Sequence, residues 1–247
     1  MKRKNFGTIL IIIGGLFLGA ALALILKNLW EQKNAEDISQ KVMESLLESL
    51  SDGTEHMQGD SQGNMQGNSD LENSQGNGTG TVGQDKNDSN AGNTPTLLPV
   101  NPDKIEIPDY ILNPHMDMPE QKIDGIPYIG YLQIEALDLK LPIASKTTYP
   151  YLKKVPCRYE GSAYFDNLVI GAHNYNRHFG RIGQLSYGDK IIFTDIDGNQ
   201  FLYEVATIEI LQPTQVEDLC AGEWPLTLYT CTLGGKTRVV VRCEKQK

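Results

Sequence analysis

Hydrophobic and polar positions divide the chain into an apolar segment, a helical segment, a polar tract and a region of alternating strands. The apolar segment, Phe6 to Leu26, contains no charged residue and consists mainly of Ile, Leu, Ala and Gly. At about 1.5 Å per residue, this length crosses a hydrocarbon core of roughly 30 Å. Three basic residues precede it, so we expect residues 1–5 in the cytoplasm, a transmembrane helix over residues 6–29 and the remainder outside.

A cleaved signal peptide is the alternative interpretation of the apolar segment. Ala21-Leu22-Ala23 has the small-x-small form of a cleavage site. The triplet lies inside the apolar run, however, and no polar stretch separates it from further Leu and Ile. The pattern therefore favours an uncleaved anchor.

The next two segments differ in composition. Ile38, Val42, Leu46 and Leu50 recur at four-residue spacing, which predicts a stalk helix over residues 30–50 that ends at Gly53. Residues 51–100 are rich in Gly, Asn, Ser and Gln and contain no aromatic residue. Such a tract buries too little apolar surface to offset the entropy of ordering, so we expect a disordered linker, with a ligand-binding repeat as the alternative. A Pro-rich lead-in, residues 101–122, follows and can pack on the next domain.

From Ile123 onward the pattern changes to strands. Leu137, Leu139, Leu141 and Ile143 alternate with other residue types at period two. Asp197-Gly198-Asn199 is a hairpin signal between two further runs. About eight short strands with little helical periodicity predict an all-β domain, a barrel or a sandwich. The expected strands span residues 128–134, 137–143, 168–172, 190–194, 200–205, 207–211, 226–230 and 238–242.

Charge narrows the possible partners. The formal net charge is −9, and the polar tract carries several acids against the single base Lys86. The strand region is nearly balanced in acidic and basic residues. Because no basic stripe is present, we expect no nucleic-acid partner.

Two strand ends carry residues suited to nucleophilic chemistry. Cys231 closes a predicted strand, and a six-residue loop containing Gly234 and Gly235 returns the chain to Arg238, which therefore lies near Cys231. A guanidinium there can stabilise a developing oxyanion, with Arg242 as the competing candidate. His173 closes another strand and can exchange a proton with the thiol, whereas His178 lies in a predicted loop.

The four cysteines have a second interpretation. In an exported chain, Cys157, Cys220, Cys231 and Cys243 can form two disulfides. We favour unpaired burial for Cys220 and Cys243, as small apolar residues.

Three stretches resemble the sortase family. Thr-Leu-Tyr-Thr-Cys at 227–231, followed by Arg-Val-Val-Val-Arg at 238–242, is similar to the family's Thr-Leu-x-Thr-Cys strand end before an Arg-x-x-Val strand. Residues 129–134 with 139–143 resemble its opening strands, and 169–174 resemble its histidine region. The Cys-to-Arg loop is short even for this family.

The resemblance implies a closed eight-stranded β-barrel over residues 123–247, outside the membrane of a Gram-positive cell. It implies a cysteine transpeptidase that cleaves the C-terminal sorting signal of secreted proteins after a Thr. A thioester then passes the fragment to an amine acceptor, a cell-wall precursor or a pilin lysine. By position, Cys231 matches the nucleophile, His173 the histidine, Arg238 the arginine and Thr230 a residue that assists the substrate or oxyanion.

Other possibilities remain open from the sequence. We expect no cofactor and no metal, although Asp195, Asp197, Glu217 and Asp218 offer oxygens of the kind that calcium uses. A cysteine hydrolase would use the same catalytic residues, and an added amine nucleophile distinguishes it. A displayed binding domain would make Cys231 a structural thiol, which selective alkylation tests.

Overall fold

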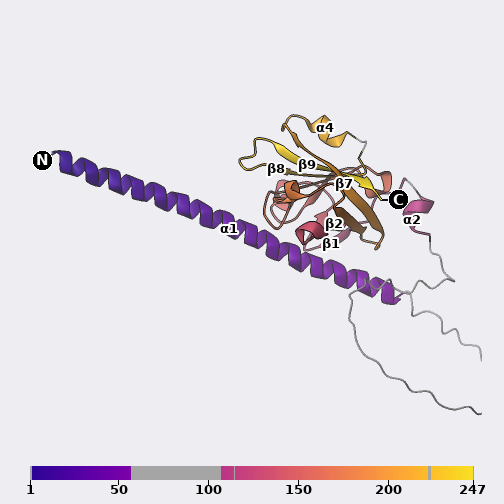
Figure 1. Ribbon diagram of the computed structural model, residues 1–247. Helices are drawn as coiled ribbons and strands as arrows, with labels where there is room; N and C mark the ends of the chain where they lie inside the picture. The colour runs from indigo at the N-terminus through magenta and orange to yellow at the C-terminus, as the bar shows by residue number, and fades with distance from the viewer. Residues whose placement is uncertain (1, 57–106, 114, 222–223, 247) are drawn as a thin grey trace, which may run out of the picture.

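A long helix and a β-barrel make up the structure, a computed structural model that describes residues 2–56, 107–113, 115–221 and 224–246 (Figure 1). The helix comes first in the chain, and the barrel strands follow a short helical lead-in. The elements are α1 (Lys2–His56), α2 (Asp109–Leu112), β1 (Gln121–Ile123), β2 (Ile126–Ile134), η1 (Glu135–Leu137), β3 (Leu139–Ala144), α3 (Tyr149–Leu152), β4 (Cys157–Glu160), η2 (Ala163–Phe165), β5 (Leu168–Ala172), η3 (Ile182–Gln184), β6 (Lys190–Asp195), β7 (Gln200–Leu211), α4 (Val216–Cys220), β8 (Leu226–Cys231) and β9 (Arg238–Lys245).

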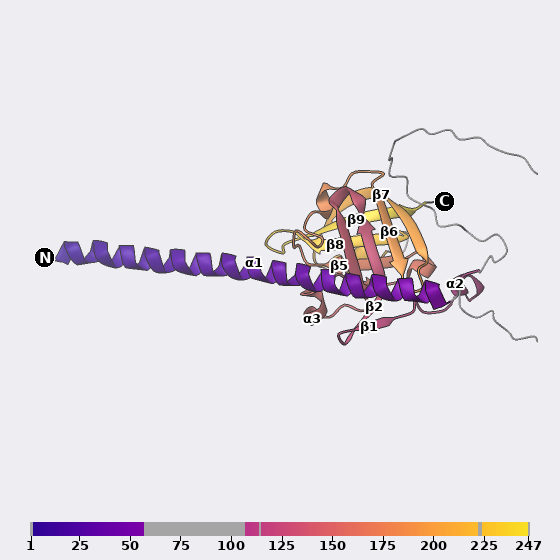
Figure 2. The same ribbon diagram turned by 90° about the horizontal axis from the view of Figure 1, so that it is seen from below.

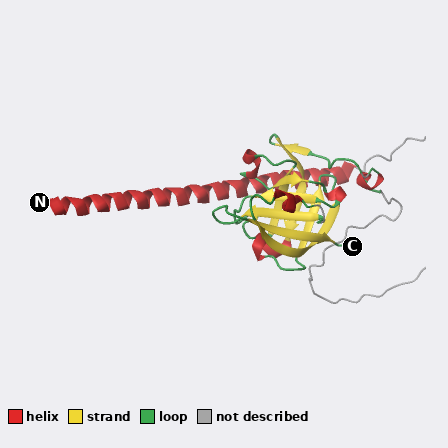
Figure 3. Cartoon of the chain, turned by 90° about the horizontal axis from the view of Figure 1, so that it is seen from above, coloured by secondary structure: helices red, strands yellow, loops and turns green. Residues whose placement is uncertain are grey.

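Eight strands close into the barrel that the sequence predicts (Figure 3). Their order is β2-β3-β4-β5-β8-β9-β7-β6, and β6 pairs back with β2 to complete the ring. The short strand β1 is a ninth strand and pairs with the first three residues of β2, Ile126 to Tyr128. Most neighbours are antiparallel, but β5 and β8 are parallel, as are β3 and β4. Closure leaves no long edge strand open to another chain.

Closure requires a glycine in β2. Gly130 has a φ of +145°, and a Cβ on it would lie 2.0 Å from the carbonyl oxygen of Thr194 in β6. An L side chain is strained at this φ and would push the two strands apart. The absence of a side chain at Gly130 therefore allows β2 and β6 to pair.

The barrel interior holds the main hydrophobic core. Alternate residues of each strand point inward, and those of β2, β5, β6 and β8 are almost fully buried. Examples are Leu132, Ile170, Phe193 and Leu228, all without exposed surface. This core fixes the strand ends on which the candidate site lies.

A smaller apolar cluster lies on the outer face of the barrel. Val169 of β5 and Val240 of β9 pack there with Leu211 and with Leu219 of α4. The connection from β7 to β8 therefore covers these strands from outside, next to the end of β8.

The N-terminal residues form one continuous helix, α1, where the sequence suggested a membrane segment and a separate stalk (Figure 2). The helix continues past Gly53, its expected end, to His56. Gly costs only about 1 kcal/mol in a helix, which the flanking residues tolerate. The part from Leu10 onward is long and apolar enough to cross a bilayer, and its apolar stretch touches nothing else in the structure. Residues 51–56 of the expected linker, 51–100, belong to α1, and the rest of the linker lies outside the described residues.

The C-terminal half of α1 packs on the barrel. Val42 and Leu46 are buried in a cluster with Tyr128, Val155 and Cys157. The hydrophobic stripe predicted for the stalk is therefore confirmed at these two positions. Its buried line continues toward the N-terminus through two small residues, Ala35 and Ser39.

The described part of the lead-in also packs on the barrel, at the end where β9 finishes. Tyr110 of α2 stacks on Tyr164 with ring centroids 4.7 Å apart, and Met118 is buried in the core. The lead-in therefore lies away from the strand ends that carry Cys231 and His173.

Candidate functional site

Cys231 and Arg238 face each other across the β8–β9 hairpin. They form the last residue pair of the antiparallel register, and the connecting loop is Thr232–Thr237, as the sequence predicts. A bond from the Thr232 amide to the Thr237 carbonyl, 3.0 Å long, closes this loop, and Gly234 and Gly235 both take positive φ in it. The hairpin geometry therefore places the guanidinium next to the thiol.

The parallel pairing of β5 with β8 brings the histidine to the same edge. Ala172 is in register with Thr230, so His173 and Cys231 are the next residues on neighbouring strands. The Thr230 hydroxyl donates a hydrogen bond of 2.8 Å to the Ala172 carbonyl oxygen, which ties the two strand ends together. Because Thr230 is buried and Cys231 half-buried, the thiol lies on the outer face of the barrel.

His173 is held between two tyrosines. Its ring stacks on Tyr175 at 5.0 Å and meets the edge of Tyr149 at 6.4 Å. Burial lowers the pKa of His173, Lys153 lowers it further, and Glu31 of α1 acts in the opposite direction. Its Nε2 is buried without a hydrogen-bond partner among the described residues. The imidazole is therefore mainly neutral at pH 7.

A pocket of about 250 Å³ opens beside the thiol. Cys231, Arg238 and Tyr229 form one side of it, and Leu211 and Leu219 form an apolar wall opposite. Gly171 leaves room for the Tyr229 ring, since a Cβ there would lie 2.5 Å from its Cζ. The pocket therefore offers an apolar surface for a substrate side chain next to a nucleophile and a cation.

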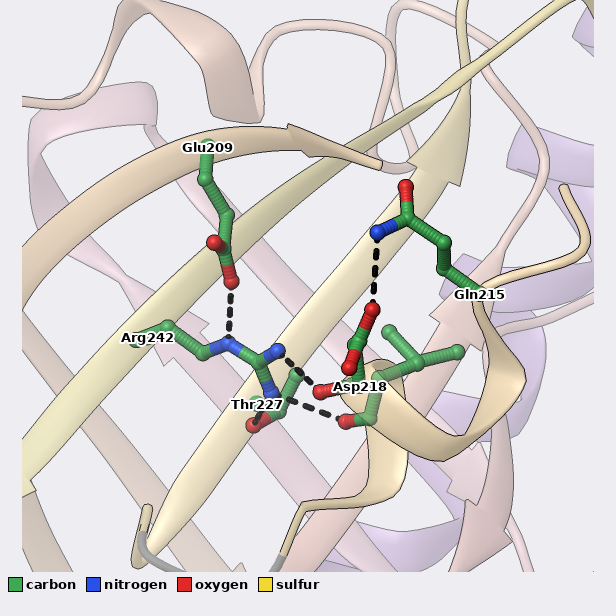
Figure 4. A network of polar contacts seen from close by, with 6 residues as sticks. Glu209, Gln215, Asp218, Thr227 and Arg242 are labelled. Atoms are coloured by element: carbon green, nitrogen blue, oxygen red, sulfur yellow. Dashed lines mark hydrogen bonds and ion pairs between the residues drawn. The ribbon is translucent and has the colours of Figure 1, made fainter. Parts of the chain in front are cut away.

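Arg238 and Arg242 were alternative candidates for the cation, and the structure separates them. Arg238 donates from Nη1 to the carbonyls of Gly235 and Thr237, and its other donors have no partner in the described part of the chain. Arg242 is 3% exposed and forms a buried network behind the pocket wall (Figure 4). It donates to Glu209 at 2.7 Å, to the carbonyls of Asp218 and Leu219, and to the Thr227 hydroxyl. Arg238 alone is thus free to meet a substrate.

The cysteines are all free, and three of them are poor nucleophiles at neutral pH. Burial raises the pKa of Cys157 and Cys243 to about 12. Burial, with Glu160 nearby, raises the pKa of Cys220 to about 11. Unpaired burial is confirmed for Cys243, whereas Cys220 is unpaired but partly exposed. Cys231 is the thiol that shares a pocket with Arg238.

His178 lies in the loop between β5 and η3, as the sequence predicts, but its side chain is buried. It is fully buried under α1, and neither ring nitrogen has a hydrogen-bond partner among the described residues. Burial lowers its pKa to about 4, and His173 lowers it as well. His178 is therefore a neutral packing residue.

Two of the four acidic residues considered for calcium, Asp195 and Asp218, have structural partners. Asp195 accepts hydrogen bonds from the backbone amides of Asp197 and Asn199 and from the Tyr164 hydroxyl, which closes the β6–β7 turn. The Asp218 carboxylate accepts a bond from Gln215. Within residues 2–56, 107–113, 115–221 and 224–246, no group of three or more His, Cys, Asp or Glu is arranged to hold a metal.

Sequence reasoning missed the residues that come to the site from a distance. Leu219 reaches it from α4, Tyr149 from α3 and Glu31 from α1. None lies in a motif, because each is placed by packing between elements. The sequence offered one signal in this region, the strand alternation, and that signal concerns other residues: it puts Arg238 and Arg242 on the same face of β9.

A family model for the sortase domain matches residues 132–246. A search of curated proteins gives no match. Sortase A from Corynebacterium diphtheriae is 25% identical, with 49% of this chain and 62% of that chain covered and a TM-score of 0.44.

Two further solved structures are similar over the same region. A Clostridium perfringens sortase D5 transpeptidase is 27% identical over 49% of this chain and 79% of that chain, with a TM-score of 0.44. Sortase C1 from Streptococcus agalactiae is 25% identical over 51% of this chain and 71% of that chain, with a TM-score of 0.45. The family model covers Cys231, His173 and Arg238 and the strands that position them, so this chain contains a sortase domain over residues 132–246.

Proposed function

We propose that this protein is a membrane-anchored cysteine transpeptidase with Cys231 as nucleophile, His173 as proton carrier and Arg238 as oxyanion ligand. The observation that carries the proposal is that the ends of β5, β8 and β9 meet: Ala172, Cys231 and Arg238 line one pocket, and His173 directly follows Ala172. Cys231 opposes Arg238 in register, and β5 brings His173 beside them. The other three cysteines lack this arrangement, and their raised pKa values keep them protonated.

The proposed reaction has two halves. The Cys231 thiolate attacks the carbonyl carbon of a Thr in a sorting signal, and Arg238 stabilises the oxyanion. Protonated His173 gives its proton to the departing amine, and a thioester remains on Cys231. An incoming amine then attacks the thioester and transfers a proton to His173, and the thiolate leaves. Atoms and charge balance without a cofactor.

The lowered pKa of His173 bears on the first half. Because burial and Lys153 both disfavour the imidazolium, the protonated form is a minority at neutral pH. Glu31 of α1 opposes this effect and keeps a larger fraction protonated. We infer that α1 contributes to the proton transfer through Glu31, in addition to anchoring the domain.

The role of Thr230 toward substrate stays a prediction. Its hydroxyl proton is engaged with the Ala172 carbonyl, and its side chain is buried. We propose that Thr230 holds the ends of β5 and β8 together and so fixes the position of Cys231 relative to His173. Substrate contact from this residue would then use its backbone.

The proposed partners follow from the reaction. They are secreted proteins with a C-terminal sorting signal and an amine acceptor, a cell-wall precursor or a pilin lysine. The apolar helix α1 would hold the enzyme in the membrane with its N-terminus in the cytoplasm and the barrel at the outer surface of a Gram-positive cell.

The test uses the full chain in detergent micelles with a library of sorting-signal peptides, followed by an added amine. We expect the wild-type mass to rise by that of an acyl fragment and to fall again as a ligated peptide appears. Cys231→Ala should show neither step. Cys220→Ala is the matched control, because Cys220 is partly exposed on the neighbouring helix and should keep both steps. Cleavage by Cys231→Ala would place the nucleophile elsewhere. If water, and not the added amine, releases the acyl fragment from the wild-type protein, the protein is a hydrolase.

A further inference from the structure

The loop that begins at His173 contacts α1 at a defined position along the helix axis. Arg177 donates from Nε to the Glu36 carboxylate at 2.9 Å, and Ala35 is fully buried in the same contact. One turn earlier in the helix, Glu31 lies near enough to influence the pKa of His173. The active-site end of the barrel therefore sits at the level of residues 31–36 of α1.

This height is close to the end of the apolar run. Because α1 is one continuous helix, the step of five positions from Leu26 to Glu31 corresponds to about 7.5 Å along its axis. The headgroup layer on each side of a bilayer adds roughly 5–7 Å to the hydrocarbon core. If the uncharged run fills that core, His173 lies at the outer boundary of the headgroups.

The β8–β9 loop extends further in the same direction. Figures 1 and 2 show this loop projecting from the barrel toward the N-terminal half of α1, while the C-terminus lies at the opposite end. Leu233 at its tip is 94% exposed, and Tyr149 beside His173 is 67% exposed. Trp30, 68% exposed on α1, lies at the same level and has the side chain preferred at membrane interfaces.

The barrel segments at this end carry charge that is complementary to an anionic surface, whereas the acids at the same level, Glu31 and Glu36, belong to α1, and Glu36 is paired with Arg177. The segments 145–159, 172–184 and 231–242 surround the site and contain basic residues but no Asp or Glu. Lys153 and Lys236 are the exposed bases nearest to Tyr149 and Leu233. The acidic residues of α4 lie on the side of the barrel away from α1 (Figure 1). Anionic headgroups attract basic residues at this distance.

We propose that the active-site end of the barrel docks on the membrane surface, with Leu233 and Tyr149 in the headgroup layer and Lys153 and Lys236 against anionic lipid. This inference rests on the membrane anchoring by α1 proposed above. The catalytic pocket then opens at the bilayer surface, and the docked helix sets its height. The catalytic pocket would then act on peptide bonds that lie next to the membrane.

The experiment measures tryptophan fluorescence of the full chain in vesicles of phosphatidylcholine and phosphatidylglycerol, with bromine near the top of the acyl chains as quencher. Three proteins are compared. Trp224→Phe retains Trp30 and reports on the anchor. Leu233→Trp and Phe165→Trp are each placed in a Trp30→Phe, Trp224→Phe background. Phe165 is the matched control, because it is 47% exposed in η2 at the opposite end of the barrel.

We expect Leu233→Trp to be quenched to within about twofold of the Trp30 protein, and Phe165→Trp to remain unquenched. Quenching of the Trp30 protein without quenching at Leu233→Trp would overturn membrane docking while leaving the anchor intact. Equal quenching at Leu233→Trp and Phe165→Trp would also overturn it, since the barrel would then have no preferred orientation. Absence of quenching in the Trp30 protein would overturn the anchor and, with it, the docking.

Discussion

At the scale of single residues, His178 should make the protein sensitive to acid. Its pKa is about 4 in the folded chain against an ordinary value of 6.5. Between these values the unfolded chain binds a proton that the folded chain does not, so stability is complete above pH 6.5 and is lost as pH falls toward 4. The shift corresponds to roughly 3 kcal/mol of unfolding free energy.

His178→Gln removes the titrating ring and tests this expectation. Chemical denaturation of the full chain in detergent at pH 7 and at pH 4.5 should show a smaller pH dependence for His178→Gln than for wild type. His115→Gln serves as the control, because His115 is exposed and its replacement should leave the pH dependence unchanged. An identical pH dependence in all three proteins would mean that His178 is protonated without cost.

The candidate site is mostly predictable from the sequence at this scale. Cys231, His173 and Arg238 were found because each lies at a strand end, where the strand register alone brings residues together. The environment of His173 was not predictable. Tyr149, Tyr175 and Glu31 reach it from three separate elements, and only packing determines which side chains surround a residue.

At the scale of elements, the Arg242 network should hold α4 against the barrel. Arg242→Met leaves the carbonyls of Asp218 and Leu219 without a donor inside the protein. We expect a loss of about 3 kcal/mol in unfolding free energy. The KM for a peptide substrate should also rise, because Leu219 forms part of the pocket wall.

Glu209→Gln is the comparison for Arg242→Met. Glu209 binds the same guanidinium, but its carboxylate is half-exposed, so its replacement should cost less than about 1 kcal/mol. Denaturation curves and peptide kinetics of the two proteins measured side by side provide the test. Equal stability of Arg242→Met and Glu209→Gln would show that the carbonyl contacts to α4 contribute little.

The strands also show where sequence patterns lose information. The expected strands 200–205 and 207–211 are one strand, β7, because a bulge between Val205 and Thr207 reverses the alternation without ending the pairing. Strand β4 was missed because it is short and its outer residues, Arg158 and Tyr159, are too polar to form an apolar run. Strand β5 was predicted with its observed ends, since it is buried throughout.

At the scale of the whole molecule, the docking of α1 was the main feature beyond the reach of sequence patterns. The spacing of Val42 and Leu46 indicated an apolar helix face, but not which surface would cover it. That surface includes Tyr128 from β2, and Val155 and Cys157 from the region where β4 begins, two segments that are separated in the sequence from each other and from α1. Docking therefore depends on the completed fold, and local periodicity contains no information about it.

This docking should stabilise both the barrel and the histidine loop. Leu46 is fully buried between α1 and the barrel, so Leu46→Ala removes apolar contact and leaves a cavity. Such a change costs about 2–5 kcal/mol in a rigid core, and we expect the lower end, because the helix can detach in place of the barrel unfolding. Once α1 detaches, the Glu36–Arg177 ion pair breaks as well.

Amide hydrogen exchange and denaturation of the full chain in detergent measure both effects. Leu46→Ala should speed exchange in residues 173–181 and lower the unfolding free energy. Leu47→Ala should do neither, because Leu47 is 39% exposed on the adjacent helix position and its removal leaves no cavity. If exchange in the histidine loop is the same in both proteins, α1 is a tether without influence on the site. If it differs as expected, the part of α1 that follows its apolar stretch also maintains the position of His173.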